Sequence, residues 1–283
     1  MTDQSAQLNW AVFSSVALPT VGDEAPPGQE HRVWPPISST LIWGEHDAVL
    51  VDAPITIKQA EALADWVVAR KRNLTTIYVT HGHGDHWLGA SVILERFPGA
   101  RMVADAAVIG HMRQQSNPEA LQGWRTRFPG QIVEDLTIAR VLTEPTIDLE
   151  GRELAAIAVG HTDMDDTTVL HVPSIGLVVA GDAVYNDVFL NLRESNTESR
   201  NQWIAALDLI EALHPVAVVA GHKREGRGDS PQNIAETRQY IRDFERVLQE
   251  ADTPREVFDR MVSLYPTRAY PSALWGSAWV LKG

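Results

Sequence analysis

Several short apolar runs in this chain end directly in side chains that bind metal ions. The run at 75–80 leads into "HGHGDH" (81–86), "AVG" precedes His161, and "VVAG" precedes both Asp182 and His222. In α/β proteins, chemistry gathers at the sheet edge where strands end. The pattern therefore favours an α/β fold that brings these strand ends together in one polar site.

Strand-like segments recur along both halves of the chain. Short apolar or alternating runs bounded by turn residues predict them. The predicted strands span 10–18, 38–44, 46–53, 75–80, 100–104, 137–142, 146–149, 152–160, 167–172, 176–182 and 216–222. We expect 137–142, 146–149 and 152–160 to belong to one antiparallel meander.

Helical periodicity separates these strands. In 56–72, apolar residues recur on one face and basic residues gather at the end, which predicts a helix covering a sheet. Further helical segments are predicted at 90–97, 105–130, 199–213, 231–250 and 254–264. Because no linker-like or low-complexity tract interrupts the pattern, we predict a single domain over 1–283, with a helical C-terminal extension over about 231–283.

The composition excludes several partners and several kinds of site. With 24 Lys+Arg against 37 Asp+Glu, the net charge of −13 argues against a nucleic-acid partner. No stretch approaches the roughly 20 apolar residues that span a bilayer, and residues 1–10 lack a signal-peptide pattern, so we expect a cytoplasmic protein without membrane association. The chain has no cysteine, so any metal must be held by histidine and carboxylate.

The segment 81–86 has the spacing of a metal site. In an extended segment residues i and i+2 project to the same side, so His81 and His83 can hold one ion together. Asp85 and His86 lie beyond a glycine bend and can turn toward a second ion. The alternative is a polar loop with incidental histidines, and an isolated histidine at a strand end is more often a satisfied core-edge residue.

The order of these residues resembles the metallo-β-lactamase fold superfamily, whose signature is HxHxDH followed by separate His, Asp and His. The resemblance covers essentially the whole chain in strand and ligand order. It implies an α/β fold, an αββα sandwich, with a cleft at one edge of its two sheets. It also implies two divalent ions, with these ligands: His81, His83 and His161 for the first, Asp85, His86 and His222 for the second, and Asp182 as the bridge.

The resemblance implies a hydrolase in which a hydroxide shared by the two ions attacks a carbonyl. Such a site suits zinc first, with manganese or iron as alternatives. Asp85 is also placed to carry a proton to the leaving group. True metallo-β-lactamases typically have Cys or Ser where Asp182 stands, and flavodiiron oxidases have Glu in place of His83, which argues against both activities.

Tyr185, three residues after Asp182, resembles the tyrosine of acyl-homoserine lactonases that donates to the substrate carbonyl. A packed ring at a strand end is the alternative. We therefore expect a small lactone or ester as substrate. An amide, an isothiocyanate, an aryl halide or a thioester, as in glyoxalase II, remains an alternative, as does a metal-stabilised binding protein without turnover.

Aromatic residues suggest the walls of the cleft. Trp87 follows the metal motif and is the first candidate for a wall, with Trp124 and Phe189 as further substrate contacts. Segments 105–130 and 188–196 interrupt the regular alternation of strands and helices between the candidate ligands, and they are predicted to cap the cleft. Trp34 and Trp275 are weaker candidates.

The last segments leave alternatives open. The C-terminal run 265–281 could close over the cleft or form a homodimer contact, and sequence does not choose. Lys223 and Arg224 could orient an anionic substrate group, although a solvated loop is favoured.

Overall fold

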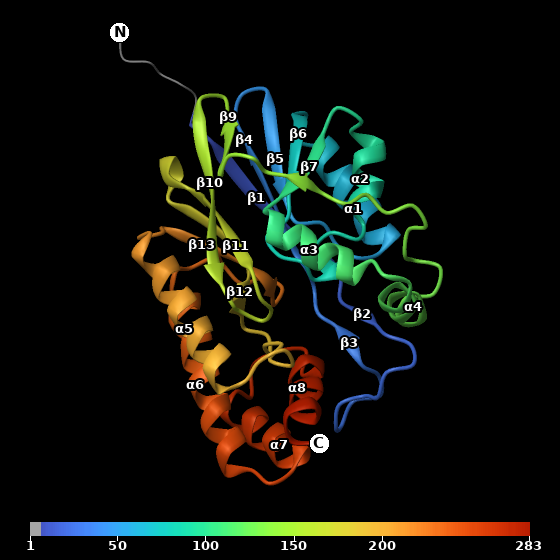
Figure 1. Ribbon diagram of the computed structural model, residues 1–283, viewed down its shortest axis with the longest axis vertical. Coiled ribbons are helices and arrows are strands. Elements are labelled where there is room, and N and C mark those ends of the chain that lie inside the picture. Colours follow the sequence, from blue (N-terminus) through green and yellow to red (C-terminus); the bar gives the residue numbers. More distant parts are fainter. Residues whose placement is uncertain (1–6) are drawn as a thin grey trace.

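The computed structural model describes residues 7–283 and consists of four layers (Figure 1). Two β-sheets face each other, with helices on both outer faces. Helices α1 (Ile57–Val68) and α2 (Ala90–Arg96) cover the first sheet, while α5 (Thr197–Ala212) and α6 (Gln232–Glu250) cover the second. The predicted αββα sandwich is thereby confirmed. Residues 1–6, which include part of the segment used to argue against a signal peptide, lie outside the described range.

The first sheet combines antiparallel and parallel strands. Its order is β1 (Asn9–Ser14), β4 (Ser38–Trp43), β5 (Asp47–Val51), β6 (Asn73–Tyr78), β7 (Arg101–Ala104) and β8 (Arg140–Val141). From β5 to β8 all neighbours are parallel. Their carboxyl ends therefore share one edge.

The second sheet is antiparallel except at one edge. Its order is β13 (Ala217–Lys223), β12 (Leu177–Asn186), β11 (Thr167–Val172), β10 (Arg152–Gly160) and β9 (Thr146–Leu149). Strands β12 and β13 are parallel, so they too end side by side. A separate two-stranded ribbon joins β2 (Leu18–Pro19) to β3 (Val33–Trp34).

Apolar side chains on both faces of the strands build the layers. Ile42, Val49 and Tyr78 of the first sheet belong to the same buried cluster as Leu170 and Val179 of the second. The opposite strand faces pack against the helices in two further clusters. Strands with two apolar faces must be covered on both sides, which is why the chain forms a sandwich.

The edge strand β8 of the first sheet lies at a different place in the fold from the one predicted. The run 137–142 contributes only the two-residue β8, which pairs with β7 in the first sheet, so its predicted place in the meander is wrong. The amide of Thr137 donates to Ser91 Oγ at 2.9 Å, and that of Leu142 donates to the Ala104 carbonyl at 2.9 Å. These bonds hold the run against α2 and β7, away from β9.

Two other predicted boundaries also change. The predicted strand 10–18 is interrupted, because β1 ends at Ser14 and Ser15 Oγ accepts from the Ile37 amide at 2.9 Å. The predicted helix 56–72 is capped by Thr56 and already ends at Val68. Lys71 adopts a φ of 54°, a left-handed conformation that turns the chain into β6.

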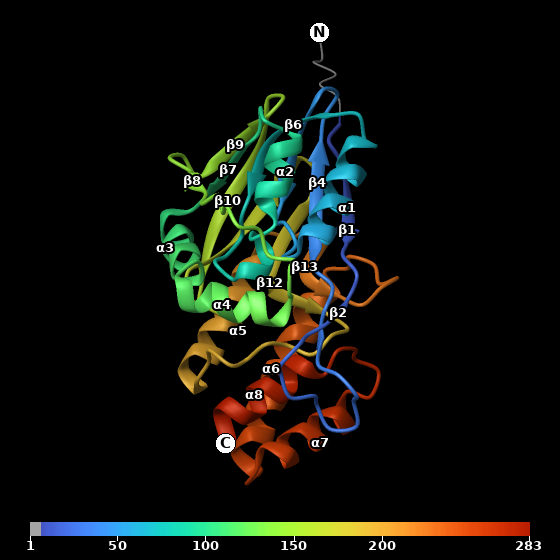
Figure 2. The same cartoon turned by 90° about the vertical axis from the view of Figure 1, so that its right-hand side faces the viewer.

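The remaining helices surround the end of the sandwich where the strands finish. The predicted helical region 105–130 forms α3 (Ala106–Gln115) and α4 (Pro118–Arg127). Figure 2 shows α7 (Pro254–Leu264) and α8 (Ser272–Lys282) below the sheets, beside the β2–β3 ribbon. In the described part of the chain, no helix has the length and apolar character to cross a bilayer. The division into domains stays a prediction.

Glu150 joins two turns at the opposite end of the sandwich. Its carboxylate accepts from the amides of Glu45, His46 and Asp47 at 2.7–2.8 Å. These backbone hydrogen bonds lower the pKa of Glu150. Because the pKa of Glu150 is lower in the folded than in the unfolded chain, its ionised carboxylate stabilises the protein at pH values above the ordinary carboxyl pKa. This contribution is lost as the pH falls through the folded-state pKa.

We therefore expect Glu150→Ala to reduce the free energy of unfolding by about 1 kcal/mol at neutral pH, a value kept small because the group is solvated. The difference from the unsubstituted protein should shrink as the pH falls into the acid range. Urea unfolding at several pH values measures it. A difference that grows toward low pH would contradict this assignment.

Candidate metal centre

The centre forms where the ends of two pairs of parallel strands meet. Asp52 follows β5 and His81 follows β6, while Asp182 lies within β12 and His222 near the end of β13. Thr80 connects the sheets beneath them, since its carbonyl accepts from the Thr168 amide at 2.9 Å and hydroxyl at 2.7 Å. The repeated apolar-run-then-ligand pattern therefore produces one cluster from two sheets.

Asp182 is displaced from the regular ladder of β12. The pairing of β12 with β13 shifts register between Gly181 and Tyr185, which frees Asp182 to turn toward the cluster. Gly221 on the neighbouring strand makes room for it, because a Cβ at Gly221 would overlap the Asp182 Oδ1 atom. A glycine is thus required at 221 for close approach rather than for a special φ.

The Asp182 carboxylate is the meeting point of the buried residues. Its Oδ1 lies 3.2 Å from His86 Nε2, and its Oδ2 lies 3.3 Å from His222 Nε2. The Tyr185 hydroxyl donates to Oδ2 at 2.8 Å. Burial opposes ionisation, but the two imidazoles together lower the pKa of Asp182 well below its ordinary value.

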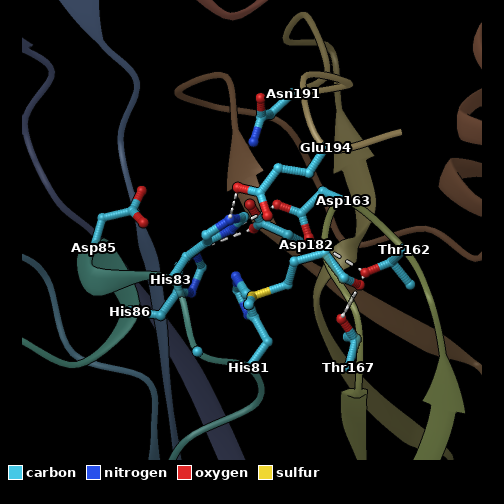
Figure 3. Close-up of polar contacts among 12 residues, drawn as sticks. His81, His83, Asp85, His86, Thr162, Asp163, Thr167, Asp182, Asn191 and Glu194 are labelled. Atoms are coloured by element: carbon cyan, nitrogen blue, oxygen red, sulfur yellow. Dashed lines mark hydrogen bonds and ion pairs between the residues drawn. The ribbon is translucent and has the colours of Figure 1, made fainter. Parts of the chain in front are cut away.

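His83 lies between two carboxylates (Figure 3). Its Nδ1 is 2.9 Å from Asp163 Oδ2, and its Nε2 is 3.1 Å from Glu194 Oε1. Burial lowers the pKa of this ring, but Asp163 and Glu194 outweigh burial and raise it. These carboxylates provide a negative environment in which a cation is stabilised.

Two hydrogen bonds orient the other side of the centre. Trp34 Nε1 donates to Asp85 Oδ2 at 2.9 Å. His222 Nδ1 is 2.8 Å from the Pro36 carbonyl, which directs its Nε2 toward Asp182 and leaves it 3.6 Å from Asp85 Oδ2. Figure 3 shows Asp85 set apart from the group around Asp163 and Asp182.

Three overlapping sets of ligand atoms have spacings that could hold an ion. They are His81, His83, Asp163 and Asp182; Asp52, His81 and His86; and Asp85, His86 and His222. Six of the seven predicted ligands fall in these sets. His161 does not; its Nδ1 contacts Asp165 Oδ1 at 2.7 Å.

Unsatisfied polar atoms test whether the cluster fits a metal. In the described part of the chain, the buried His81 Nε2 and His161 Nε2 have no hydrogen-bond partner. His86 Nε2, Asp163 Oδ2 and Asp182 Oδ1 lie at ion-pair distances from neighbouring groups but also lack hydrogen-bond geometry. Buried polar atoms without partners are costly. Imidazole nitrogens and carboxylate oxygens are the donors that zinc and similar divalent ions take. The donor set therefore fits a divalent metal.

Asp52 is a residue that our sequence analysis missed. Its Oδ1 accepts from the Thr80 amide at 2.8 Å, and its Oδ2 accepts from the Thr80 hydroxyl at 2.8 Å and lies 2.9 Å from His86 Nδ1. Carboxylates commonly orient metal-binding imidazoles in this way. The signal was available, because "VLVDA" is another apolar strand that ends in aspartate.

Asp163 and Glu194 were missed for a different reason. Asp163 is fully buried among the ligands, yet it lies in "HTDMDD", where three aspartates follow His161 and sequence offers no way to choose among them. Glu194 reaches His83 from the long connection after β12. Only the folded chain brings either residue to the centre.

A cavity of about 360 Å³ opens beside the ligands. His83, Asp85, Asp182, Tyr185 and His222 form part of its lining. Three aromatic residues form walls of the cavity, namely Trp34, Trp124 and Phe189. Three arginines also line it, namely Arg32, Arg127 and Arg193. Both segments predicted as a cap, 105–130 and 188–196, supply lining residues. Substrate contact by Trp124 and Phe189 stays a prediction.

The C-terminal helix also lines this cavity. Ser272, Ala273 and Val280 of α8 contribute to it, which places part of the run 265–281 over the cleft. The predicted homodimer contact stays untested. Trp275 does not reach the cavity, because it is buried against Phe258 and Trp279.

Trp87 does not form a wall, which corrects our expectation. Its ring belongs to the core between the first sheet and its helices, and its Nε1 donates to the Gly82 carbonyl at 3.0 Å. The short helix η1 (Gly84–His86) turns the chain inward after the ligands and directs Trp87 into the core. Lys223 is buried and paired with Asp229 at 2.9 Å rather than solvated.

Comparison with known proteins agrees with this geometry. Residues 32–222 match the family model described as metallo-beta-lactamase superfamily. The chain is 23% identical over 212 residues to "Metallo-beta-lactamase type 2" of Bacteroides fragilis, covering 74% of this chain and 76% of that protein. A 66-residue segment is 38% identical to "Hydroxyacylglutathione hydrolase" of Parasynechococcus marenigrum, covering 23% of this chain and 25% of that protein.

Solved structures share the fold. A metallo-beta-lactamase family protein from Thermus thermophilus superposes with a TM-score of 0.65 at 18% identity, covering 95% of this chain and 91% of that one. At such low identity the likeness establishes the fold alone.

Proposed function

This chain belongs to the metallo-beta-lactamase superfamily and is a metal-dependent hydrolase, and we propose that it hydrolyses a small lactone or ester. His81, His83 and His161 would hold one divalent ion, Asp85, His86 and His222 would hold a second, and Asp182 would contribute to both. Divalent ions at such a site make water nucleophilic near neutral pH and polarise a carbonyl.

The observation that carries the choice of substrate is the position of Tyr185. Its hydroxyl contacts Asp182 and its side chain lines the cavity, so a substrate carbonyl beside Asp182 lies within reach of a phenolic donor. Burial and the neighbouring Asp182 raise the pKa of Tyr185 well above its ordinary value, and the phenol keeps its proton. A neutral hydroxyl can donate to the oxygen of an ester or lactone as negative charge develops there.

The remaining residues position the reactants. Asp85 faces the cavity and is oriented by Trp34, which suits it to accept a proton and return it to the departing alkoxide. Trp124 and Phe189 offer apolar surface to the rest of the substrate. Zinc as the metal, a cytoplasmic location and a homodimer remain predictions.

A substrate panel tests the class of bond. Purified protein is assayed with lactones, aryl esters, amides, isothiocyanates, chlorinated aromatics and glutathione thioesters, before and after chelator treatment. We expect lactone or ester turnover that disappears with chelator and returns with zinc. Turnover of another class, with lactones and esters inert, would reject the proposal; thioester turnover would favour the activity named for the 66-residue match.

Tyr185→Phe isolates the proposed donor. Because the substitution removes one hydroxyl and keeps the ring, we expect kcat to fall about 100-fold while metal content stays unchanged. Tyr270→Phe, a tyrosine outside the cavity lining, serves as the matched control. An unchanged kcat in Tyr185→Phe would assign Tyr185 a packing role only.

A further inference from the structure

We propose that Arg32 and Arg193 form a carboxylate-binding subsite, so that the substrate is a lactone or ester bearing a carboxylate group. This inference rests on the proposed function for the bond that is cleaved. The subsite itself rests on separate observations, because both arginines line the cavity that also contains Asp182 and His222.

The two arginines reach the cavity from distant parts of the chain. Arg32 precedes β3, and its Nη2 donates to the Ser272 carbonyl at the start of α8 at 3.2 Å. Arg193 lies in the connection between β12 and α5, and its Nε donates to Asn191 Oδ1 at 3.0 Å. Each guanidinium is thus anchored by one nitrogen to a neutral oxygen, which leaves further N–H groups for a ligand.

Neither guanidinium has a carboxylate partner. Within residues 7–283, no ion pair within 4.0 Å involves Arg32 or Arg193, whereas Arg127 in the same lining is paired with Asp23 at 3.1 Å. Glu194, which interacts with Arg193 at longer range, instead bonds His83. Two partly buried cations without a close counterion would be stabilised by an anion from outside.

The cations are close enough to affect each other. Burial and then the charge of Arg193 lower the pKa of Arg32, opposed by Asp23 and Glu24. Gly276 of α8 lies between the two side chains: a Cβ there would come within 2.7 Å of Arg32 Nη2 and 3.2 Å of Arg193 Cδ. The absence of a side chain at 276 lets both arginines lie over the same turn of α8.

The chemistry of the pair indicates a carboxylate. Guanidinium groups bind carboxylates through paired N–H donors, and two adjacent guanidinium groups can share both oxygens of one carboxylate. The protein as a whole has a net charge of −13, so its surface does not attract anions in general. Binding of an anion in the cavity would therefore depend on this arginine pair. A substrate would place its carboxylate here and its reacting carbonyl beside Asp182 and Tyr185.

Binding tests the subsite without requiring turnover. Protein with its measured metal content is titrated with 3-phenylpropanoate and with the neutral 3-phenylpropanamide by calorimetry. Tryptophan emission, to which Trp34 and Trp124 of the cavity lining contribute, gives a second readout. We expect the acid to bind roughly tenfold more tightly than the amide. Arg32→Gln and Arg193→Gln should each remove this preference without changing metal content, which separates the subsite from direct binding of the acid to metal.

Two further variants control the experiment. Arg125→Gln removes an exposed arginine of α4 outside the cavity lining, and the preference should remain. Gly276→Ala keeps both charges but crowds both side chains, so it should weaken acid binding severalfold while leaving the protein folded. Equal binding of acid and amide, or a preference unaffected by either glutamine variant, would overturn the inference.

Kinetics then connect the subsite to the proposed reaction. Mono-4-nitrophenyl glutarate and 4-nitrophenyl valerate have similar length but differ in charge. We expect Arg193→Gln to raise KM roughly tenfold for the anionic ester only. If neither these esters nor the lactones of the panel are hydrolysed while acid binding still depends on both arginines, the proposed bond class fails and the subsite stands. If both esters turn over with equal KM in all variants, the bond class stands and the subsite fails.

Discussion

Replacing Asp182 by alanine is expected to lower kcat/KM by more than about a thousandfold and to leave the protein with less than half of its bound metal. The carboxylate contacts His86 and His222 from its two oxygens, and its removal leaves two buried imidazoles without their shared anion. A bridging ligand contributes to both halves of the proposed site. Its removal should therefore lower activity and metal content more than removal of a ligand that contributes to one half only. Elemental analysis after dialysis, together with esterase kinetics, measures both effects.

The control for this substitution is Asp208→Ala, which removes a solvent-exposed aspartate paired with Arg238. It should retain full activity and metal content. If Asp182→Ala binds as much metal as the unsubstituted protein, Asp182 is not a ligand and the assignment of the bridge is wrong.

Asp52→Ala should produce the second-largest effect, although Asp52 is not one of the seven ligands predicted from sequence. We expect metal affinity to fall about 10–100-fold, because the His86 ring loses the carboxylate that orients it. We also expect the free energy of unfolding to fall by about 3 kcal/mol, since the buried amide and hydroxyl of Thr80 lose their acceptor. The φ of 60° at Asp52 adds strain for alanine.

Asp52→Asn separates these contributions, because asparagine tolerates the left-handed conformation and keeps one acceptor oxygen. It should recover most of the stability but less of the metal affinity. Competition with a chromogenic chelator and urea unfolding provide the measurements, and Asp65→Ala, at an exposed aspartate, is the control. Unchanged metal affinity in Asp52→Ala would show that His86 is oriented without it.

The family and the sandwich could be predicted from the sequence, and six of the seven predicted ligands cluster at the candidate metal centre. An HGHGDH segment after an apolar strand, with later strands ending in glycine and a ligand, predicts ligands at the sheet edge, since parallel strands must end together. The predicted family membership is confirmed. These features are local: the HGHGDH residues follow one strand, the later candidates lie in or just after other strands, and the strands are recognisable from their apolar runs.

The tertiary structure alone decided which other side chains surround that centre. Glu194 and Asp163 approach His83 through contacts that no local pattern encodes, and Trp87 turned out to pack in the core although it follows the ligands directly. Likewise, Arg32 and Arg193 lie 161 positions apart, yet both side chains lie beside Gly276 on a helix near the C-terminus. Local periodicity reports which face of an element is buried, but a pocket is made by the packing of distant elements, and its lining follows only once they are folded together.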